Sequence, residues 1–349
     1  MRLGIIARSD NTGLGYQTRE LVKMLDPYKV MLIDSSFFNK NRQNVDWYEG
    51  YSYASTRAGY PKRGEIRSFL EGLDVVFSCE TFYGPIIVDM SRDMGIKTVL
   101  QYNYEFLVNM EHPDQTAPDV FVAPSLWNID NVRAKFKDIS RIVHLPPPTD
   151  PNTFAMARDT NLSKVHNRIL HIVGKKAAKD RNGTNTVFEM LRYSREDYDL
   201  VITSQTEIEE KPRDARLKIK YGNIKNREDL YVGFDAMILP RRYAGLCLPM
   251  NEALISAMPV FMTNISPNDT VLPSKWLCES EKIGQFRAKC IIDFYGGNPK
   301  QLAKIVDYYV GLRRQDKSEA KRQAFDIGMN NFSVDVLKNK YLELFDSLK

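Results

Sequence analysis

Two stretches of the chain combine glycine, cationic side chains and a following helix. The first runs from Gly174 to Gly183 and contains Lys175 and Arg181, and the second runs from Leu239 to Val260. Glycine lets the backbone approach a ligand closely, cations pair with phosphate charge, and the first N–H groups of a helix attract anions. Both stretches therefore predict contacts with a diphosphate.

The segment Ala244-Gly245-Leu246-Cys247-Leu248-Pro249-Met250-Asn251-Glu252 resembles the donor-site signature of family-four glycosyltransferases, which have the GT-B fold. In that signature seven residues separate two glutamates. Glu252 matches the second glutamate, which in the family hydrogen-bonds the nucleotide ribose. Ala244 takes the place of the first, which normally touches the sugar. We expect Glu252 in the first turn of a helix that ends before Pro259.

A leaving diphosphate needs fixed cations and N–H donors to stabilise its charge. In the second stretch, the backbone of Gly245, Leu246 and Cys247 is expected in this role. Arg242 and its neighbour Arg241 would add to it, or pair with a charged sugar.

In the first stretch, relatives carry an arginine after the first glycine and a lysine just before the second. Lys175 and Asn182 hold those places here, and Arg181 is adjacent to Asn182. We therefore predict that Lys175 and Arg181 bind the phosphates. A solvated basic loop is the alternative.

Two further segments match donor-binding parts of the same family. Gly13 and Gly15, after the first expected strand, match a glycine-rich loop beneath the donor phosphates. They lack the third glycine of a dinucleotide fingerprint, and a tight turn that needs positive φ is the alternative. Asn223 and Ile224 match the segment that packs on the nucleotide base.

Polar residues also end a strand expected in the first half of the chain. Asn103 and Glu105 follow it at the carboxyl edge of the sheet, where α/β proteins bind ligands. Many relatives have a histidine near this point, close to the reacting sugar, and this chain has His112 only further along. We predict that Glu105 and Asn103 are the catalytic residues.

An insert at 47–64 carries five aromatic residues interleaved with basic ones and shows no strand or helix period. Aromatic rings stack on bases, and cations bind a phosphate backbone. We predict acceptor binding by Tyr53, Arg57, Lys62 and Arg63. A solvated loop pinned to the surface by its tyrosines is the alternative.

Short apolar runs alternate with amphipathic segments, which predicts an α/β protein whose parallel sheets are covered by helices. In the first half, strands are expected at 3–6, 30–33, 75–78, 98–101, 120–123 and 141–144. In the second half, strands are expected at 169–173, 200–203, 236–239, 260–262 and 288–293, with helices at 227–233 and 299–312.

The proline run that begins at Pro146 marks a domain boundary, because consecutive prolines form a stiff, extended linker. It resembles the segment that joins the two GT-B domains. We therefore expect two Rossmann-like domains facing across a cleft: an acceptor-binding domain at 1–150 and a nucleotide-sugar-binding domain at 151–330. The last segment, 331–349, is expected to form a helix that packs back on the first domain.

The composition of the 349 residues is that of an ordinary globular protein, with 43% hydrophobic and 27% charged residues. The N-terminus does not resemble a signal peptide, no apolar run reaches the roughly 20 residues of a membrane span, and the four cysteines form no CxxC pair. A cytoplasmic location is expected. Residues 1–150 carry a net charge of −2, which leaves +7 for 151–349, the half expected to bind a diphosphate.

The matching segments occur in the family's order from Gly13 to Glu252. The resemblance implies a retaining glycosyltransferase of the hexosyltransferase type (EC 2.4), with a nucleotide diphosphate sugar as donor, no cofactor and no obligatory metal. A non-catalytic relative that binds nucleotide sugars or nucleic acid remains the alternative, because Ala244 replaces an acid. A dehydrogenase is excluded, since neither glycine loop has the full fingerprint with an acid about 20 residues on.

The acceptor is expected to be a hydroxyl group of a saccharide or small molecule. A hydroxymethylpyrimidine in phage-type DNA is the second candidate, suggested by the insert at 47–64. Against DNA stands the slightly acidic first half, since proteins that bind nucleic acid usually present a broad basic surface.

Overall fold

The computed structural model describes residues 1–34, 43–51, 55–56, 60–107, 117–174, 179–243 and 245–348. The chain forms two compact units. The N-terminal unit comprises Met1–Pro148, Ala288–Cys290 and Val334–Lys349, and the C-terminal unit comprises Thr149–Arg287 and Ile291–Ser333. The chain therefore passes from the N-terminal unit into the C-terminal unit at the end of the proline run.

The N-terminal unit contains a seven-stranded sheet whose neighbouring strands are all parallel. Its strand order, β3-β2-β1-β4-β5-β6-β7, is Rossmann-like, and the order reverses between β1 and β4. Most of its central strands are apolar and buried, as parallel strands between helices must be. The strands are β1 (Leu3–Arg8), β2 (Lys29–Ile33), β3 (Ser55–Thr56), β4 (Val75–Cys79), β5 (Lys97–Gln101), β6 (Val120–Ala123) and β7 (Arg141–His144).

Amphipathic helices accompany this sheet. In the first of them, Leu21, Val22 and Leu25 are buried. The helices are α1 (Gly13–Leu25), α3 (Arg63–Leu70), α4 (Ile86–Asp93), α6 (Ile129–Phe136) and α12 (Val334–Asp346), with 3₁₀ turns η1 (Val45–Tyr48) and η2 (Tyr104–Phe106).

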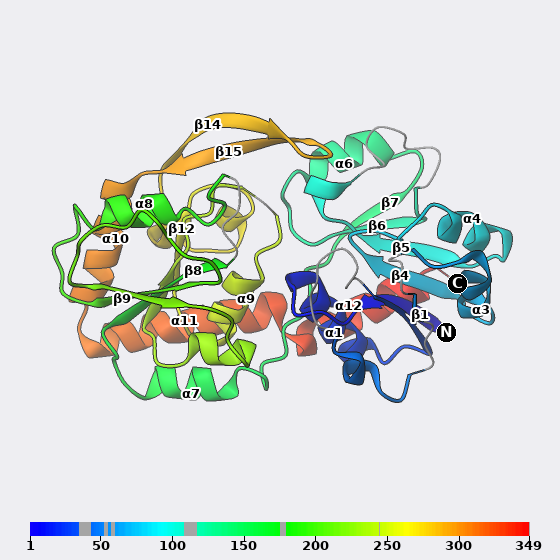
Figure 1. The fold of residues 1–349 in the computed structure, drawn as a ribbon, viewed down its shortest axis with the longest axis horizontal. Helices are drawn as coiled ribbons and strands as arrows, with labels where there is room; N and C mark the ends of the chain where they lie inside the picture. The colour runs from blue at the N-terminus through cyan, green and yellow to red at the C-terminus, as the bar shows by residue number, and fades with distance from the viewer. Residues whose placement is uncertain are drawn as a thin grey trace. The chain divides into compact units, whose positions relative to one another are not determined.

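The last helix, α12, belongs to the N-terminal unit and packs beside α1 (Figure 1). The rings of Tyr341 and Phe345 lie 6.0 and 5.7 Å from the ring of Phe77 on β4. The Gln101 side chain donates a hydrogen bond of 2.7 Å to the Tyr341 hydroxyl. Helix α12 therefore completes the hydrophobic core of the N-terminal unit.

The C-terminal unit is built around a six-stranded parallel sheet with the order β10-β9-β8-β11-β12-β13. This order is also Rossmann-like, with its reversal between β8 and β11. The strands are β8 (Arg168–Gly174), β9 (Asp199–Ser204), β10 (Leu217–Tyr221), β11 (Ala236–Ile238), β12 (Val260–Thr263) and β13 (Leu277–Cys278). A separate antiparallel hairpin pairs β14 (Ser280–Arg287) with β15 (Ile291–Gly297).

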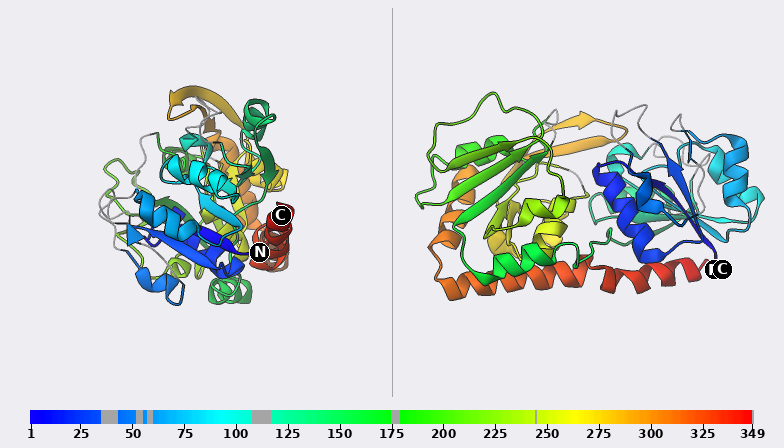
Figure 2. Two further views of the ribbon diagram at one scale, coloured as in Figure 1. Left: turned by 90° about the vertical axis from the view of Figure 1, so that its right-hand side faces the viewer. Right: turned by 60° about the horizontal axis from the view of Figure 1, so that its bottom comes forward.

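Helices cover this sheet as well, and the long helix α11 runs along α7 and α9 (Figure 2). A Cβ at Gly328 of α11 would lie 2.8 Å from the backbone nitrogen of Ile255 in α9, so glycine permits this close approach. The helices are α7 (Ala155–Ser163), α8 (Thr184–Met190), α9 (Leu248–Ile255), α10 (Pro299–Gly311) and α11 (Arg314–Phe332), with 3₁₀ turns η4 (Arg227–Tyr231), η5 (Asn268–Thr270) and η6 (Ser274–Trp276).

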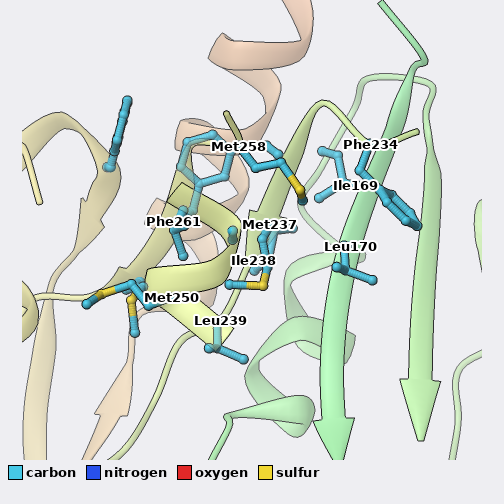
Figure 3. Close-up of a cluster of buried hydrophobic side chains, with 14 of the residues drawn as sticks. Ile169, Leu170, Phe234, Met237, Ile238, Leu239, Met250, Met258 and Phe261 are labelled. Atoms are coloured by element: carbon cyan, nitrogen blue, oxygen red, sulfur yellow. The ribbon is translucent and has the colours of Figure 1, made fainter. Parts of the chain in front are cut away.

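The core of the C-terminal unit lies where α9 crosses β8, β11 and β12 (Figure 3). Ile169 and Leu170 of β8 and Met237 of β11 are at most 1% exposed. Met250 of α9 and Phe261 of β12 are buried in the same cluster. This packing fixes α9 against the sheet and thereby fixes the loop that leads into it.

Three segments differ from the sequence-based expectations. The strand predicted at 288–293 is wrong at its start, because β15 begins at Ile291. This strand pairs with β14, which was not predicted from the sequence because the polar residues of β14 are mostly exposed. The predicted helix at 227–233 is only the 3₁₀ turn η4. The insert expected to lack strand structure contributes Ser55–Thr56 to the sheet as β3.

Within the described ranges, no helix combines the length and the hydropathy that crossing a bilayer requires.

Candidate functional site

The loops after β8 and β11 lie at the carboxyl edge of the C-terminal sheet, on either side of its order reversal. In open parallel sheets this edge, at the reversal, is where ligands bind. The two loops are joined directly, because the backbone N–H of Arg242 donates to the carbonyl of Arg181 at 2.9 Å. The topology therefore brings together the two stretches that the sequence singled out for phosphate binding.

The first loop begins at Gly174, whose φ of +68° favours glycine. Lys175, predicted to bind phosphate, lies outside the described residues, as does the rest of 175–178. Arg181 is half-buried, and its guanidinium carbon lies 5.1 Å from the ring centroid of Tyr243 in the second loop. The aromatic face holds this cation close to the junction of the two loops.

Other residues of the first loop stabilise the protein itself. The Asn182 amide donates to the carbonyls of Ile172 and Val173 at 2.9 and 3.2 Å. A Cβ at Gly183 would lie 2.2 Å from the carbonyl oxygen of Pro240, so this glycine is required by contact between the loops. Asn182 and Gly183 thus position the loop rather than a ligand.

The N-terminus of α8 already binds a side-chain carboxylate of the protein itself. The Asp180 carboxylate accepts hydrogen bonds of 2.9 Å from the backbone N–H groups of Thr184 and Asn185. These two N–H groups therefore hold a side chain in this structure, as a helix cap does.

Behind the first loop, His171 links three elements in the core. Its Nδ1 donates to the carbonyl of Ile238 at 2.9 Å, and its Nε2 lies 3.0 Å from the Thr184 hydroxyl. Because a carbonyl can only accept, Nδ1 carries the proton and Nε2 accepts from Thr184 in the neutral ring. Burial lowers the pKa of His171, so the ring ties β8, β11 and α8 together without charge.

Arg242, predicted to bind the donor, makes several contacts within the protein. Its Nε donates to the Tyr295 carbonyl at 3.2 Å, and its Nη1 donates to the Lys179 carbonyl at 2.8 Å. Its guanidinium carbon lies 5.1 Å from the ring centroid of Phe294. Arg242 therefore joins both loops to the β14–β15 hairpin.

The second loop leads into α9 through Gly245, Leu246 and the N-cap residue Cys247. No side chain of the described residues caps α9, and its first turn contains no acidic residue. The N–H groups at a helix start carry partial positive charge and favour an anion. Pro249 has no N–H, and the N–H groups of Met250 and Asn251 donate to the Cys247 carbonyl at 3.0 and 3.3 Å. Among the described residues, the N–H groups that remain for an anion are therefore those from Gly245 to Leu248.

Glu252 is the fifth residue of α9, so it begins the second turn rather than lying in the first turn as expected. It is 3% exposed. The Tyr231 hydroxyl donates to its Oε2 at 2.6 Å, and Nη1 of Arg227 lies 3.4 Å from its Oε1. Arg227 in turn lies over the ring of Phe154 at 5.3 Å. The carboxylate is held on both oxygens.

Burial raises the pKa of Tyr231 well above its usual value, and the charge of Glu252 and the hydrogen bond to it raise this pKa further. The phenol therefore stays protonated and donates to the carboxylate. Sequence reasoning missed Tyr231 and Arg227, because they precede Glu252 on a different element and carry no motif of their own.

The predicted base-contacting residues, Asn223 and Ile224, follow β10 at the carboxyl edge of the same sheet. Both are exposed, and the side-chain oxygen Oδ1 of Asn223 accepts from Nε2 of Gln205 at 2.9 Å. Gly222 precedes them with a φ of +102°, so the chain turns there.

In the N-terminal unit, Gly13 and Gly15 belong to the first turn of α1, and neither has positive φ. The alternative role in a positive-φ turn is therefore wrong. A Cβ at Gly15 would lie 1.9 Å from the carbonyl oxygen of Asp10, which explains glycine there by close approach. The Gly15 N–H donates to the hydroxyl of the N-cap residue Thr12 at 3.3 Å.

The predicted catalytic residues follow β5. Glu105 lies in η2 and is 3% exposed, whereas Asn103 just before it is half-buried. His112 lies outside the described residues.

The aromatic insert is partly packed into the N-terminal unit. Tyr48 is fully buried and donates to the Arg8 carbonyl at 2.6 Å. The Trp47 ring lies 5.2 Å from that of Tyr16. These rings hold the insert to β1 and α1, as in the alternative of a loop pinned by its aromatic residues.

Of the predicted acceptor residues, Tyr53 and Arg57 lie outside the described residues. Lys62 caps α3 and Arg63 is its first residue, with the Lys62 N–H donating to the Glu65 carboxylate at 2.7 Å. Both cations therefore stand at a helix start and not in an irregular loop.

No group of three or more histidine, cysteine, aspartate or glutamate side chains within the described part of the chain could hold a metal ion. All four cysteines are buried, and none forms a disulfide.

No protein-family model and no curated protein matches the chain. Solved structures match it over nearly its full length. A glycosyltransferase from Rickettsia africae has a TM-score of 0.69 at 14% identity, with 99% of this chain and 98% of that chain covered. The Anabaena protein HepE in complex with UDP and glucose has a TM-score of 0.67 at 10% identity, with 99% and 100% covered.

Sucrose-phosphate synthase from Thermosynechococcus elongatus gives a TM-score of 0.65 at 13% identity, with 100% of this chain and 99% of that chain covered. Together with the Rossmann-like strand order of both sheets, these matches show that the chain has the GT-B glycosyltransferase fold, which confirms the fold predicted from its sequence.

Proposed function

We propose that this chain is a glycosyltransferase that moves a sugar from a nucleotide diphosphate sugar to a hydroxyl acceptor. The observation that carries the proposal is the arrangement around α9. The segment from Gly245 to Leu248, with its backbone N–H groups, leads into α9, and a carboxylate fixed on both oxygens, Glu252, lies on the same helix at the order reversal of the C-terminal sheet. An anion site and a hydroxyl acceptor on one helix suit a diphosphate and a ribose.

Each part of the donor has an assigned contact in this proposal. Glu252 accepts hydrogen bonds from the ribose hydroxyls. Lys175 and Arg181 bind the diphosphate together with the N–H groups of the segment from Gly245 to Cys247. Asn223 and Ile224 contact the base. Similar structures that contain UDP, such as HepE with UDP and glucose, support a uridine nucleotide as the first candidate.

The chemistry follows from these contacts. As the sugar leaves, negative charge develops on the diphosphate, and prepositioned cations and N–H donors stabilise it without reorganisation. We propose transfer with retention at the anomeric carbon and with no metal. We keep Asn103 and Glu105 as the proposed catalytic residues and Gly13 and Gly15 as proposed donor-binding residues.

For the acceptor, a saccharide or small molecule remains the first candidate and a modified pyrimidine in DNA the second. Trp47 and Tyr48 of the insert are used in packing, which leaves fewer rings to stack on bases. A non-catalytic relative that binds nucleotide sugars is the remaining alternative, since Ala244 supplies no carboxylate to the sugar.

A panel of nucleotide sugars, assayed for release of nucleoside diphosphate with and without added acceptors, tests the proposal. We expect release from at least one uridine or guanosine diphosphate sugar, and its abolition in Glu252→Ala. Nucleotide binding without release from any donor, in the presence of saccharide and hydroxymethylpyrimidine-DNA acceptors, would favour the non-catalytic alternative.

A further inference from the structure

Arg241 is a buried cation in the loop that follows β11, and it is 5% exposed. Its backbone is fixed on both sides. The N–H donates to the Leu239 carbonyl at 2.7 Å, and the carbonyl accepts from the Thr263 hydroxyl at 2.7 Å. These two hydrogen bonds fix the backbone position from which the Arg241 side chain extends.

The guanidinium of Arg241 has little compensation for its charge. Nη1 donates to the Leu246 carbonyl at 2.7 Å, whereas Nε is buried without a hydrogen-bond partner. Among the described residues, no carboxylate lies within ion-pairing distance of it. The positive charge is thus removed from water and only partly satisfied.

Two cations of the same unit show how such a charge is compensated elsewhere. Lys321 lies 2.7 Å from Asp235, with 2% and 4% of the two side chains exposed. Arg227 likewise pairs with Glu252. A buried charge without a counter-charge is strongly unfavourable, whereas a counter-charge with additional hydrogen bonds offsets its desolvation. Arg241 therefore stands out as a cation that an anionic ligand would stabilise.

The place of Arg241 indicates which ligand would reach it. Leu246, which its guanidinium contacts, directly precedes the N-cap Cys247 of α9. That helix start has no side-chain cap and no acid in its first turn. A guanidinium and a helix dipole thus act on the same short segment, and both favour negative charge.

We propose that Arg241 binds an anionic oxygen group of the donor, either a phosphate of the diphosphate or a carboxylate on the sugar. This inference rests on the proposed function, since it assumes a nucleotide diphosphate sugar at α9. An acidic residue at position 244 would repel a carboxylate on the sugar. Alanine at this position is therefore compatible with a donor whose sugar carries a carboxylate. In either case Arg241, rather than Arg242, supplies the additional positive charge, because the guanidinium of Arg242 already binds two carbonyls.

The test is calorimetric titration of the full chain with UMP, UDP, UDP-glucose and UDP-glucuronic acid. Wild type is compared with Arg241→Gln, and Arg192→Gln, an exposed cation beyond the far end of α8, is the matched control. We expect Arg241→Gln to lower affinity by about 10- to 100-fold, the usual effect of a charge-assisted hydrogen bond. The control should bind all four ligands as wild type does.

The pattern of loss identifies the group that is bound. Weaker binding of every diphosphate with unchanged binding of UMP assigns the phosphate, and a loss confined to UDP-glucuronic acid assigns a carboxylate on the sugar. Equal affinities of wild type and Arg241→Gln for all four ligands would overturn the inference. Wild type that binds none of them would instead overturn the proposed function, and this inference with it.

Thermal unfolding of each variant checks that it is folded. If Arg241→Gln does not fold, Arg241→Lys replaces it in the same titrations, because lysine keeps the charge but loses the planar, bidentate geometry. A loss of diphosphate or uronate affinity in Arg241→Lys supports the inference, and wild-type affinity for all four ligands contradicts it.

Discussion

The hydroxyl of Tyr231 donates a hydrogen bond of 2.6 Å to the carboxylate of Glu252, and both residues are buried. Arg227 contacts the opposite oxygen of the same carboxylate. One contact to each oxygen fixes the plane of the carboxylate as well as its charge. A ligand hydroxyl that meets Glu252 therefore meets an acceptor whose geometry is set in advance, which lowers the entropy lost on binding.

The first prediction is that Tyr231→Phe weakens recognition of the ribose. The variant removes the hydroxyl that orients Glu252 but keeps the ring in the core. Titration with UDP and 2′-deoxy-UDP measures the effect as the ratio of the two affinities. We expect the preference of wild type for UDP to fall several-fold, because a hydrogen bond to a charged group contributes about 1.5–3 kcal/mol.

The matched control is Tyr309→Phe, which removes another buried hydroxyl of the same unit that donates to the Asp235 carbonyl at 2.7 Å. It should lower stability by a similar amount and leave the preference for UDP unchanged. If Tyr231→Phe and Tyr309→Phe have the same ratio of affinities as wild type, Tyr231 acts on stability alone.

The second prediction concerns the phosphate cations. Arg181→Ala and Lys175→Ala should each weaken UDP binding by about tenfold, or 1.4 kcal/mol, because each removes a charge-assisted contact to the diphosphate. Binding of uridine, which has no phosphate, should not change. Calorimetry at two salt concentrations measures both, and unchanged UDP affinity in both variants would refute the assignment.

The third prediction concerns the buried pair of Lys321 and Asp235. Lys321 Nζ also donates to the carbonyls of Asn161 and Lys164 at 2.6 and 3.1 Å, so it ties α11 to α7. Lys321→Met leaves the Asp235 charge buried without its partner and should lower the free energy of unfolding by about 3–5 kcal/mol. Urea unfolding measures this loss.

Adding Asp235→Asn to Lys321→Met provides the control, because it removes the uncompensated charge. The double variant should recover part of the stability. A double variant that is less stable than Lys321→Met would show that hydrogen bonds to Asp235, rather than the pairing of charges, account for the effect.

The fourth prediction is a loss of stability in mild acid caused by His171. Burial lowers its pKa below the ordinary 6.5, although the nearby Asp180 acts in the opposite direction. As the pH falls below about 6.5, the unfolded chain takes up a proton that the folded chain does not, so folding becomes less favourable. The contribution is fully present above that pH.

Urea unfolding at pH 7.5 and 5.0 measures this contribution. His171→Gln should be less stable than wild type at pH 7.5, because its core hydrogen bonds are disturbed, but it should lose less stability between the two pH values. An equal loss in wild type and His171→Gln would assign the acid sensitivity to other groups.

Much of the fold could be predicted because parallel strands leave a clear pattern. The strands at 120–123 and 141–144 were predicted with the bounds that the structure has, since each is a short run of strand-forming residues bounded by loops. β14 could not be predicted in this way. Its polar residues are mostly exposed, and hydrogen bonds to β15 hold it in place.

The parts of the candidate site that lie in one continuous segment of the sequence could be predicted. Glu252 and the loop before it stood out by spacing, and Arg242 by its charge. The pairing of Glu252 with Tyr231, and the use of Arg242 to join two loops and a hairpin, depend on tertiary contacts between distant segments. Single-sequence patterns contain no information about such contacts, so residue type alone did not distinguish Arg241 from Arg242.

The most direct test of the central claim is calorimetric titration of wild type and Glu252→Gln with UDP and GDP. The account predicts that wild type binds at least one of them and that Glu252→Gln, which keeps the shape of the side chain but removes its charge and one acceptor, binds it at least about tenfold more weakly. A folded wild-type chain that binds neither nucleotide, or a folded Glu252→Gln variant with wild-type affinity, would contradict it.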